Sequence, residues 1–232
     1  MTATPSPTPL PLLARSSLSE TTADLLRQRI LNGDYAPGAR LVEAEIARQL
    51  GISRGPVREA LSALQAEGLT SESPGRGSSV RTLSPDDIRE IYEVRATLES
   101  GAIRLILERG DRDTLTSLQA AVAALDTARR AHDRDAFVDA DLRLHEVLCR
   151  GSGNRRLVEA WSSQVALLRA LIRLEVDQVA EDMKVTYRSH AELVAAIKRG
   201  DAVEATDVCW RLFREAAGSL AGLLAVRRGK YL

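Results

Sequence analysis

Asp141 and His145 could share a metal ion, because they lie four residues apart in a segment with helical periodicity. That spacing places both side chains on one face of a helix. His190 follows in a later helical segment, and a carboxylate with two imidazoles from facing helices can hold a divalent metal with open coordination positions. Asp141 and His145 could instead form a hydrogen-bonded pair within their helix, with His190 as a partly buried core histidine. The spacing alone favours this second interpretation.

An Asp-His-His site with an open coordination position could also activate water, as in a metal-dependent hydrolase. The sequence contains no motif for a separate acid or base, and it contains no nucleophile elbow or phosphate-binding loop. We therefore expect no enzymatic activity and keep the metal-dependent hydrolase as an alternative function.

A second group of functional side chains begins at Ser53, which predicts the start of a helix just after the helix breaker Gly51. Three apolar residues predict the inward face of this helix: Val57, Leu61 and Leu64. The opposite face carries Arg54 and Arg58. Arginine can form two hydrogen bonds with O6 and N7 of guanine, and the Ser53 hydroxyl suits a phosphate. These residues favour recognition of DNA.

The elements around these arginines predict a winged helix-turn-helix. Residues 43–50 predict a short helix, and Gly51 permits the sharp turn by which a second helix enters the major groove. Residues 69–73 and 78–82 predict a hairpin with Arg76 at its tip, where it could contact the DNA backbone or the minor groove. The arginines could also form only a solvated surface. The turn, the inward stripe and the hairpin together favour the DNA contact.

Composition limits the class of protein. With 44% apolar and 28% charged residues, the 232-residue chain can bury a core and is long enough for two domains. Aromatic residues make up only 3%, which favours packed helices. The 32 basic and 32 acidic residues balance, so DNA binding must depend on local charge. The sequence has no apolar run of membrane-spanning length, and Cys149 and Cys209 are expected to be reduced thiols. We therefore predict a cytoplasmic protein.

The periodicity predicts a mainly α fold, with an antiparallel all-helical bundle of about six helices and no strand after the winged domain. A first helix is expected over residues 19–32, and Ser84-Pro85 is expected to open the bundle. The predicted parts are a disordered arm at 1–17, a winged helix-turn-helix DNA-binding domain at 18–82, a helical effector-binding and dimerisation domain at 83–225, and a tail at 226–232.

The first domain resembles the GntR family of bacterial regulators. The similar residues run from Leu41 through Gly51-Ile52-Ser53-Arg54-Gly55-Pro56-Val57-Arg58 to Leu61, and continue at Glu67-Gly68-Leu69 and Gly75-Arg76-Gly77. The resemblance implies a homodimer on a pseudo-palindromic operator, with Ser53, Arg54, Gly55 and Arg58 at the DNA. Gly55 stands where the family often carries threonine or serine, so a side-chain contact is lost there.

The second domain resembles the all-helical FCD ligand-binding domain of FadR-type GntR regulators. The similar segments are residues 93–99, 141–145 with Gly153-Asn154, and 190–202. Many members hold a metal there with one aspartate and three histidines, and bind a small organic acid on or beside it. The third histidine is replaced by Leu212 in this chain. Asp141, His145 and His190 could still hold zinc, manganese or nickel, and a metal-free pocket stays open as an alternative.

Arg95 is the expected effector-binding residue, because the corresponding arginine of the family commonly faces the cavity and a guanidinium matches a carboxylate. Arg95 could instead pair with Glu99 on the surface, one helical turn away. The sequence thus predicts an effector-responsive transcriptional repressor. Besides the hydrolase, an architectural DNA-binding protein without effector control is a further alternative, although the long helical domain argues against it.

Overall fold

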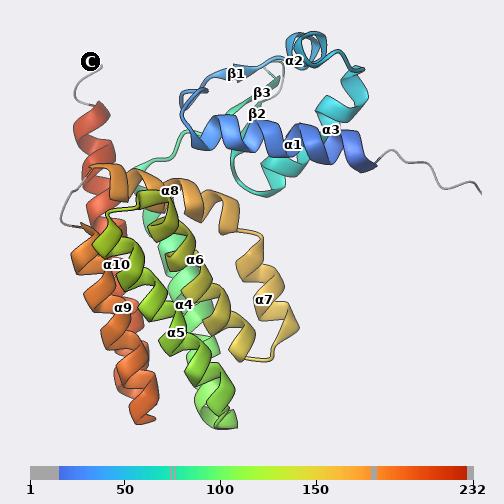
Figure 1. Ribbon diagram of the computed structural model, residues 1–232. Coiled ribbons are helices and arrows are strands. Elements are labelled where there is room, and N and C mark those ends of the chain that lie inside the picture. The colour runs from blue at the N-terminus through green and yellow to red at the C-terminus, as the bar shows by residue number, and fades with distance from the viewer. Residues whose placement is uncertain (1–15, 74, 76, 179–181, 229–232) are drawn as a thin grey trace, which may run out of the picture. The chain divides into compact units, whose positions relative to one another are not determined.

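A computed structural model describes residues 16–73, 75, 77–178 and 182–228 of the chain. The chain divides into two compact units, residues 1–80 and 81–232 (Figure 1). The expected arm falls almost wholly outside the described residues, as do Arg76 at the expected hairpin tip and the last four residues.

The first unit combines three helices with a small antiparallel sheet. The helices are α1 (Ser16–Leu31), α2 (Glu43–Leu50) and α3 (Arg54–Ala66), and the strands are β1 (Arg40–Leu41), β2 (Thr70–Ser73) and β3 (Gly77–Val80). The strand order is β1-β3-β2, with Thr70 opposite Val80. The predicted winged helix-turn-helix is confirmed, although α1 begins three residues earlier than expected, at Ser16.

Local sequence explains the turn between α2 and α3. Gly51 ends α2 in the left-handed region, with φ of 67°, which glycine adopts without a steric penalty. Ser53 is the extended N-cap residue of α3. The apolar stripe of α3 is buried, and α3 packs on α1. Arg27 of α1 donates to both carboxylate oxygens of Glu67, at 2.7 and 2.6 Å, and so ties α1 to the end of α3.

The second unit contains seven helices in the described residues, where about six were predicted. They are α4 (Pro85–Arg109), α5 (Arg112–Ala131), α6 (Arg134–Gly151), α7 (Arg155–Ser162), α8 (Val165–Gln178), α9 (Asp182–Arg199) and α10 (Ala202–Arg228). The additional helix arises because the chain between Arg155 and Gln178 forms two helices, α7 and α8. Ser163 and Gln164 donate side-chain hydrogen bonds to the carbonyl of Ala160, at 2.8 and 3.3 Å, and so satisfy the end of α7 without a glycine or proline.

A capping box fixes the start of α4. The Ser84 backbone N–H donates to the Asp87 carboxylate at 2.8 Å, and the Asp87 N–H donates to the Ser84 hydroxyl at 3.1 Å. Pro85 occupies the first turn, where its missing N–H has no partner to lose. The predicted helix start at Ser84-Pro85 is confirmed.

Helix contacts close a ring in the second unit, in the order α4, α6, α5, α9, α10 and back to α4. An apolar cluster fills one part of its interior, with Leu125, Phe137 and Leu168 fully buried. Buried polar side chains, among them Asp141, His145 and His190, fill another part. None of the helices among the described residues is long and apolar enough to cross a lipid bilayer.

Candidate functional site

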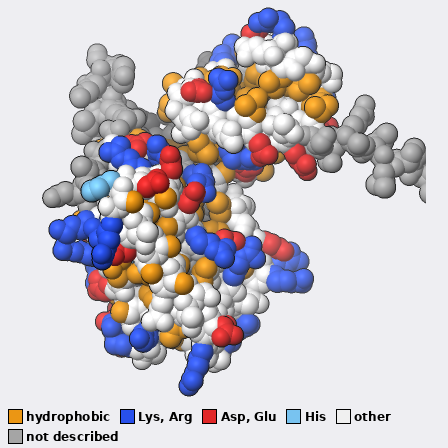
Figure 2. Space-filling model, in the orientation of Figure 1, with side chains coloured by type: hydrophobic (Ala, Val, Ile, Leu, Met, Phe, Trp, Pro, Cys, Tyr) orange, Lys and Arg blue, Asp and Glu red, His pale blue; other side chains and the backbone are white. Residues whose placement is uncertain are grey.

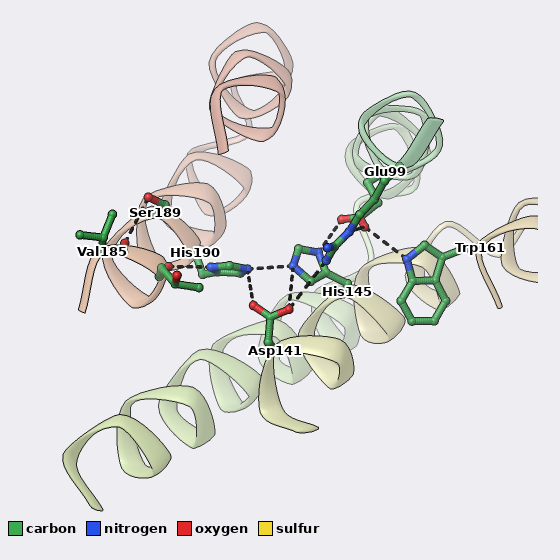
Figure 3. Close-up of polar contacts among 9 residues, drawn as sticks. Glu99, Asp141, His145, Trp161, Val185, Ser189 and His190 are labelled. Atoms are coloured by element: carbon green, nitrogen blue, oxygen red, sulfur yellow. Dashed lines mark hydrogen bonds and ion pairs between the residues drawn. The ribbon is translucent and has the colours of Figure 1, made fainter. Parts of the chain in front are cut away.

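Asp141 and His145 of α6 meet His190 of α9 inside the helical ring (Figure 3). Their side chains are buried, with residue exposures of 3%, 0% and 1%. One ligand atom from each residue lies within 4.8 Å of the other two. The structure therefore brings together the three residues that the sequence singled out.

The distances among the three side chains show which of them are in contact. His145 Nε2 lies 3.8 Å from Asp141 Oδ2, beyond hydrogen-bond distance. His190 Nε2 lies 3.1 Å from Asp141 Oδ1 and 2.8 Å from His145 Nε2. The contacts that define the cluster thus run between α6 and α9, and the alternative of a hydrogen-bonded pair within α6 is wrong.

The outer nitrogens of both imidazoles face acceptors. His190 Nδ1 lies 2.6 Å from the carbonyl oxygen of Thr186, which can only accept, so this nitrogen carries a proton. His145 Nδ1 lies 2.5 Å from Glu99 Oε2. Burial alone would raise the pKa of Glu99, but His145 and Arg95 lower it below its usual value, so Glu99 is a carboxylate and accepts from His145.

This assignment leaves both Nε2 atoms as electron-pair donors when the imidazoles are neutral. Burial, followed by the charge of Arg95, lowers the pKa of His145 and favours its neutral form. Two nitrogen lone pairs and the Asp141 carboxylate then lie within 4.8 Å of one another, an arrangement that suits a cation. This donor set fits a divalent metal with nitrogen and oxygen ligands.

Arg95 of α4 lies beside this cluster with 2% of its surface exposed. Its Nε donates to Glu99 at 3.0 Å, and its Nη2 lies 3.8 Å from Asp141 Oδ2. Burial opposes the charge of Arg95, but Glu99 and Asp141 raise its pKa, so the guanidinium stays charged. The expected pair with Glu99 forms, but its expected place on the surface is wrong because both side chains are buried.

A cavity in the helical unit is lined by Arg95 and all three members of the Asp-His-His cluster. Leu212 of α10 lines the same cavity. The position at which the family resemblance implies a third histidine therefore lines the same cavity as the Asp-His-His cluster, although its side chain is apolar. The rest of the described lining is mixed, with Tyr92, Phe137, Ile172, Glu175, Val176, Val185, Thr186, Ser189, Phe213, Glu215, Ala216 and Ser219.

Two residues that support this site were not assigned a role in it from the sequence. Glu99 binds Arg95 and His145, and it also accepts a hydrogen bond from Trp161 Nε1 at 3.2 Å (Figure 3). The spacing identified Glu99 as a possible partner of Arg95, but it gave no sign of the contact with His145. Trp161 gave only an apolar helical pattern, because its contact with Glu99 joins α7 to α4 across the fold.

The expected DNA contacts lie at the N-terminal end of α3. Ser53, Arg54 and Arg58 are exposed, and Gly55 is half-buried. The Ser53 side chain makes no capping hydrogen bond. In the part of the chain that the structure describes, neither arginine forms an ion pair, whereas exposed Arg48 and Arg156 pair with Glu45 and Glu159. Acidic and basic side chains are interspersed on the face of the helical unit that Figure 2 shows.

Two family models match the chain. Residues 18–80 match the gntR family of bacterial regulatory proteins, and residues 90–215 match the FCD domain. The second match alone covers more than half of the 232 residues.

Curated relatives are bacterial regulators. An uncharacterized HTH-type transcriptional regulator, YdhC of Bacillus subtilis, is 33% identical over 133 residues, which are 57% of this chain and 59% of that protein. A probable D-xylose utilization operon transcriptional repressor of Paenarthrobacter nicotinovorans is 30% identical over 82% of each chain. The gluconate operon transcriptional repressor of Bacillus licheniformis is 26% identical, over 82% of this chain and 79% of that protein.

A solved structure agrees with these relatives. A putative GntR transcriptional regulator from Rhodococcus sp. RHA1 has a TM-score of 0.72 at 26% identity, over 89% of this chain and 99% of that one. Regulators of this family bind DNA, and they bind small-molecule effectors through the FCD domain. This chain belongs to the gntR family of bacterial regulatory proteins, with a C-terminal FCD domain, and it is a transcriptional regulator rather than an enzyme.

Proposed function

We propose that this chain is a homodimeric, cytoplasmic repressor that binds a palindromic operator. An organic acid, bound beside a divalent metal in the helical unit, controls this binding. The observation that carries the proposal is the convergence of Asp141, His145 and His190 next to Arg95 in one cavity. A regulator without effector control would have no need of these buried polar groups, which are costly to keep out of water.

Charge balance supports the presence of a metal. With neutral imidazoles, the buried group contains one cation, Arg95, and two carboxylates, Glu99 and Asp141. An anionic effector would meet a net negative charge there. Zinc, manganese or nickel, held by the Asp-His-His cluster, would supply positive charge and open coordination positions for a carboxylate. Arg95 would orient that carboxylate from the side of α4.

The exposed start of α3 supports the DNA contact. Arg54 and Arg58 are solvent-exposed, and the Ser53 hydroxyl is not used as a helix cap. We assign base contacts to the two arginines and a phosphate contact to Ser53, with Gly55 allowing close approach of the backbone. Arg76, which lies outside the described residues, keeps its proposed role as the wing contact. In a dimer, two such helices would read half-sites about one helical turn apart.

Control by the effector requires a coupling between the two units. Residues Leu83-Ser84-Pro85 join them, and the capping box at Ser84 ties this segment to the start of α4. Because α4 also carries Arg95, effector binding can act on the linker through a single helix. The effector would then change the fit of the two winged domains to their half-sites.

The direction of control follows from the relatives. Two of them are described as repressors, of a D-xylose utilization operon and of a gluconate operon. We therefore propose that the chain represses an operon and that its effector releases the operator. Gluconate is a reasonable first probe because it is a small organic acid.

Fluorescence anisotropy tests the whole proposal. The purified chain is titrated onto duplexes that tile the DNA upstream of its own gene, with and without pools of organic acids. We expect one duplex to bind with at least about a thousandfold preference over random DNA, and one pool to weaken that binding. Binding no tighter than to random duplex contradicts the repressor, and unchanged affinity with a saturating effector contradicts effector control.

A further inference from the structure

Two polar atoms on α4 point to a ligand contact that the Asp-His-His cluster does not explain. Among the described residues, three buried side chains have a polar atom without a hydrogen-bond partner: Tyr92, Arg95 and Ser100. The atoms of Tyr92 and Arg95 are the hydroxyl and Nη2, and both residues line the cavity. Buried donors are rarely left without an acceptor, so these two atoms call for one.

The positions of the two residues make a shared acceptor geometrically simple. Tyr92 and Arg95 are three residues apart on α4, and therefore lie on the same helix face. Phe213 supports both, with its ring centroid 6.1 Å from that of Tyr92 and 4.5 Å from the guanidinium carbon. The guanidinium carbon lies 5.8 Å from the Tyr92 ring centroid. Packing thus holds a neutral and a charged donor next to each other.

Both groups remain donors at neutral pH. Burial, followed by the charge of Glu175, raises the pKa of Tyr92 above its ordinary value. The neighbouring Arg95 lowers it by less, so the hydroxyl keeps its proton. Arg95 stays charged for the reasons given above. A group with two acceptor oxygens could take one hydrogen bond from each residue, as a carboxylate does.

We propose that the Tyr92 hydroxyl and Arg95 Nη2 form a two-donor anchor for one carboxylate, and that the cavity consequently selects a monocarboxylate as effector. This inference rests on the proposed effector site in the same cavity. Tyr92 is a binding residue in this scheme, with Phe213 positioning its ring.

The charges around the cavity exclude a second carboxylate. Arg95 is the only arginine or lysine among the described residues that line it. Asp141, Glu175 and Glu215 line it as well. The metal of the proposed function and the anchor serve the same carboxylate, so a second one would have no cationic group left to pair with and would face these acidic groups. Hydroxyl groups on the ligand would instead find acceptors.

Isothermal titration calorimetry on the full chain tests this selection, with the metal content of every sample measured. The probes are butyrate, succinate and butyramide, and a second pair, gluconate and glucarate. We expect at least one monocarboxylate to bind about tenfold more tightly than its dicarboxylate partner, equal to 1.4 kcal/mol, and butyramide to give no heat. If neither monocarboxylate binds, or if the dicarboxylates bind as tightly, the inference is overturned.

The variant Tyr92→Phe tests the anchor itself, because it removes the hydroxyl and keeps the ring against Phe213. We expect monocarboxylate binding to weaken about 10- to 100-fold, as for loss of a hydrogen bond to a charged group. Tyr187→Phe makes the same change on α9 at a residue outside the cavity lining and should bind as the wild type does.

Equal binding by Tyr92→Phe and the wild type would show that the hydroxyl bonds to water or not at all, and would overturn the anchor. If Tyr92→Phe fails to fold, the preference for monocarboxylates measured on the wild type still decides the matter. Failure of the proposed function is distinguishable, since it is read from operator binding and not from heats of ligand binding.

Discussion

His145 Nε2 and His190 Nε2 face each other at 2.8 Å, while the Nδ1 atoms of both rings face oxygen acceptors. Two imidazoles with this pattern cannot both be neutral and satisfied, because each would present a lone pair to the other. The contact becomes favourable when a proton joins the two nitrogens or when a metal ion beside them binds both lone pairs. The chemical consequences of this relationship are open to direct measurement.

Removal of one imidazole should abolish metal retention. We expect the wild type to keep a divalent metal through desalting, and His190→Ala to lose it, because only His145 and Asp141 would remain as ligands. Elemental analysis of the desalted proteins gives the answer. His132→Asn is the matched control, since His132 is exposed and stands outside the cluster. A wild type without metal would reject the site.

Glu99 should control the metal through His145. In Glu99→Gln the amide cannot hold the His145 ring as a carboxylate does, so we expect zinc affinity to fall about 10- to 100-fold. The variant also leaves Arg95 with one carboxylate fewer, and we expect a loss of about 3 kcal/mol in the free energy of unfolding.

Competition with a chromophoric chelator measures the zinc affinity, and urea denaturation measures the stability. The same substitution at exposed Glu108, on the same helix, should leave both values unchanged. Unaltered zinc affinity in Glu99→Gln would show that His145 does not depend on this carboxylate.

Leu212→His should complete the ligand set. Leu212 is 8% exposed and lines the same cavity as Asp141, His145 and His190. A fourth ligand should tighten zinc binding by about tenfold or more, equal to 1.4 kcal/mol, as measured by the same chelator competition. Leu212→Gln brings a polar side chain without an imidazole and should not tighten it. A histidine variant with wild-type affinity would mean that position 212 cannot reach the metal.

Arg58→Ala should reduce specific DNA binding more than non-specific binding. An arginine that reads guanine contributes about 1–3 kcal/mol of discrimination, whereas a phosphate contact weakens binding to all sequences and flattens the salt dependence. Anisotropy titrations on operator and random duplexes at several salt concentrations separate the two. Arg104→Ala, an exposed arginine of the helical unit, is the control. Equal losses on both duplexes would make Arg58 a phosphate contact.

Local sequence patterns were sufficient for the winged domain and for the start of α4. The breaker Gly51, the N-cap Ser53 and the apolar stripe of α3 act within a few residues of one another, so their effect can be read without knowledge of the fold. The split between α7 and α8 was missed for a physical reason. It depends on side-chain hydrogen bonds from Ser163 and Gln164, which give no strong breaker signal.

The sequence by itself determined that Asp141 and His145 share a helix face, because that follows from the α-helical repeat. Only the tertiary structure decided that His190 meets them, that Glu99 joins Arg95 to His145, and that Tyr92 has an unused donor. These contacts join α4, α6 and α9 across the helical ring. These contacts arise from long-range packing and burial. The periodicity within one segment cannot predict them.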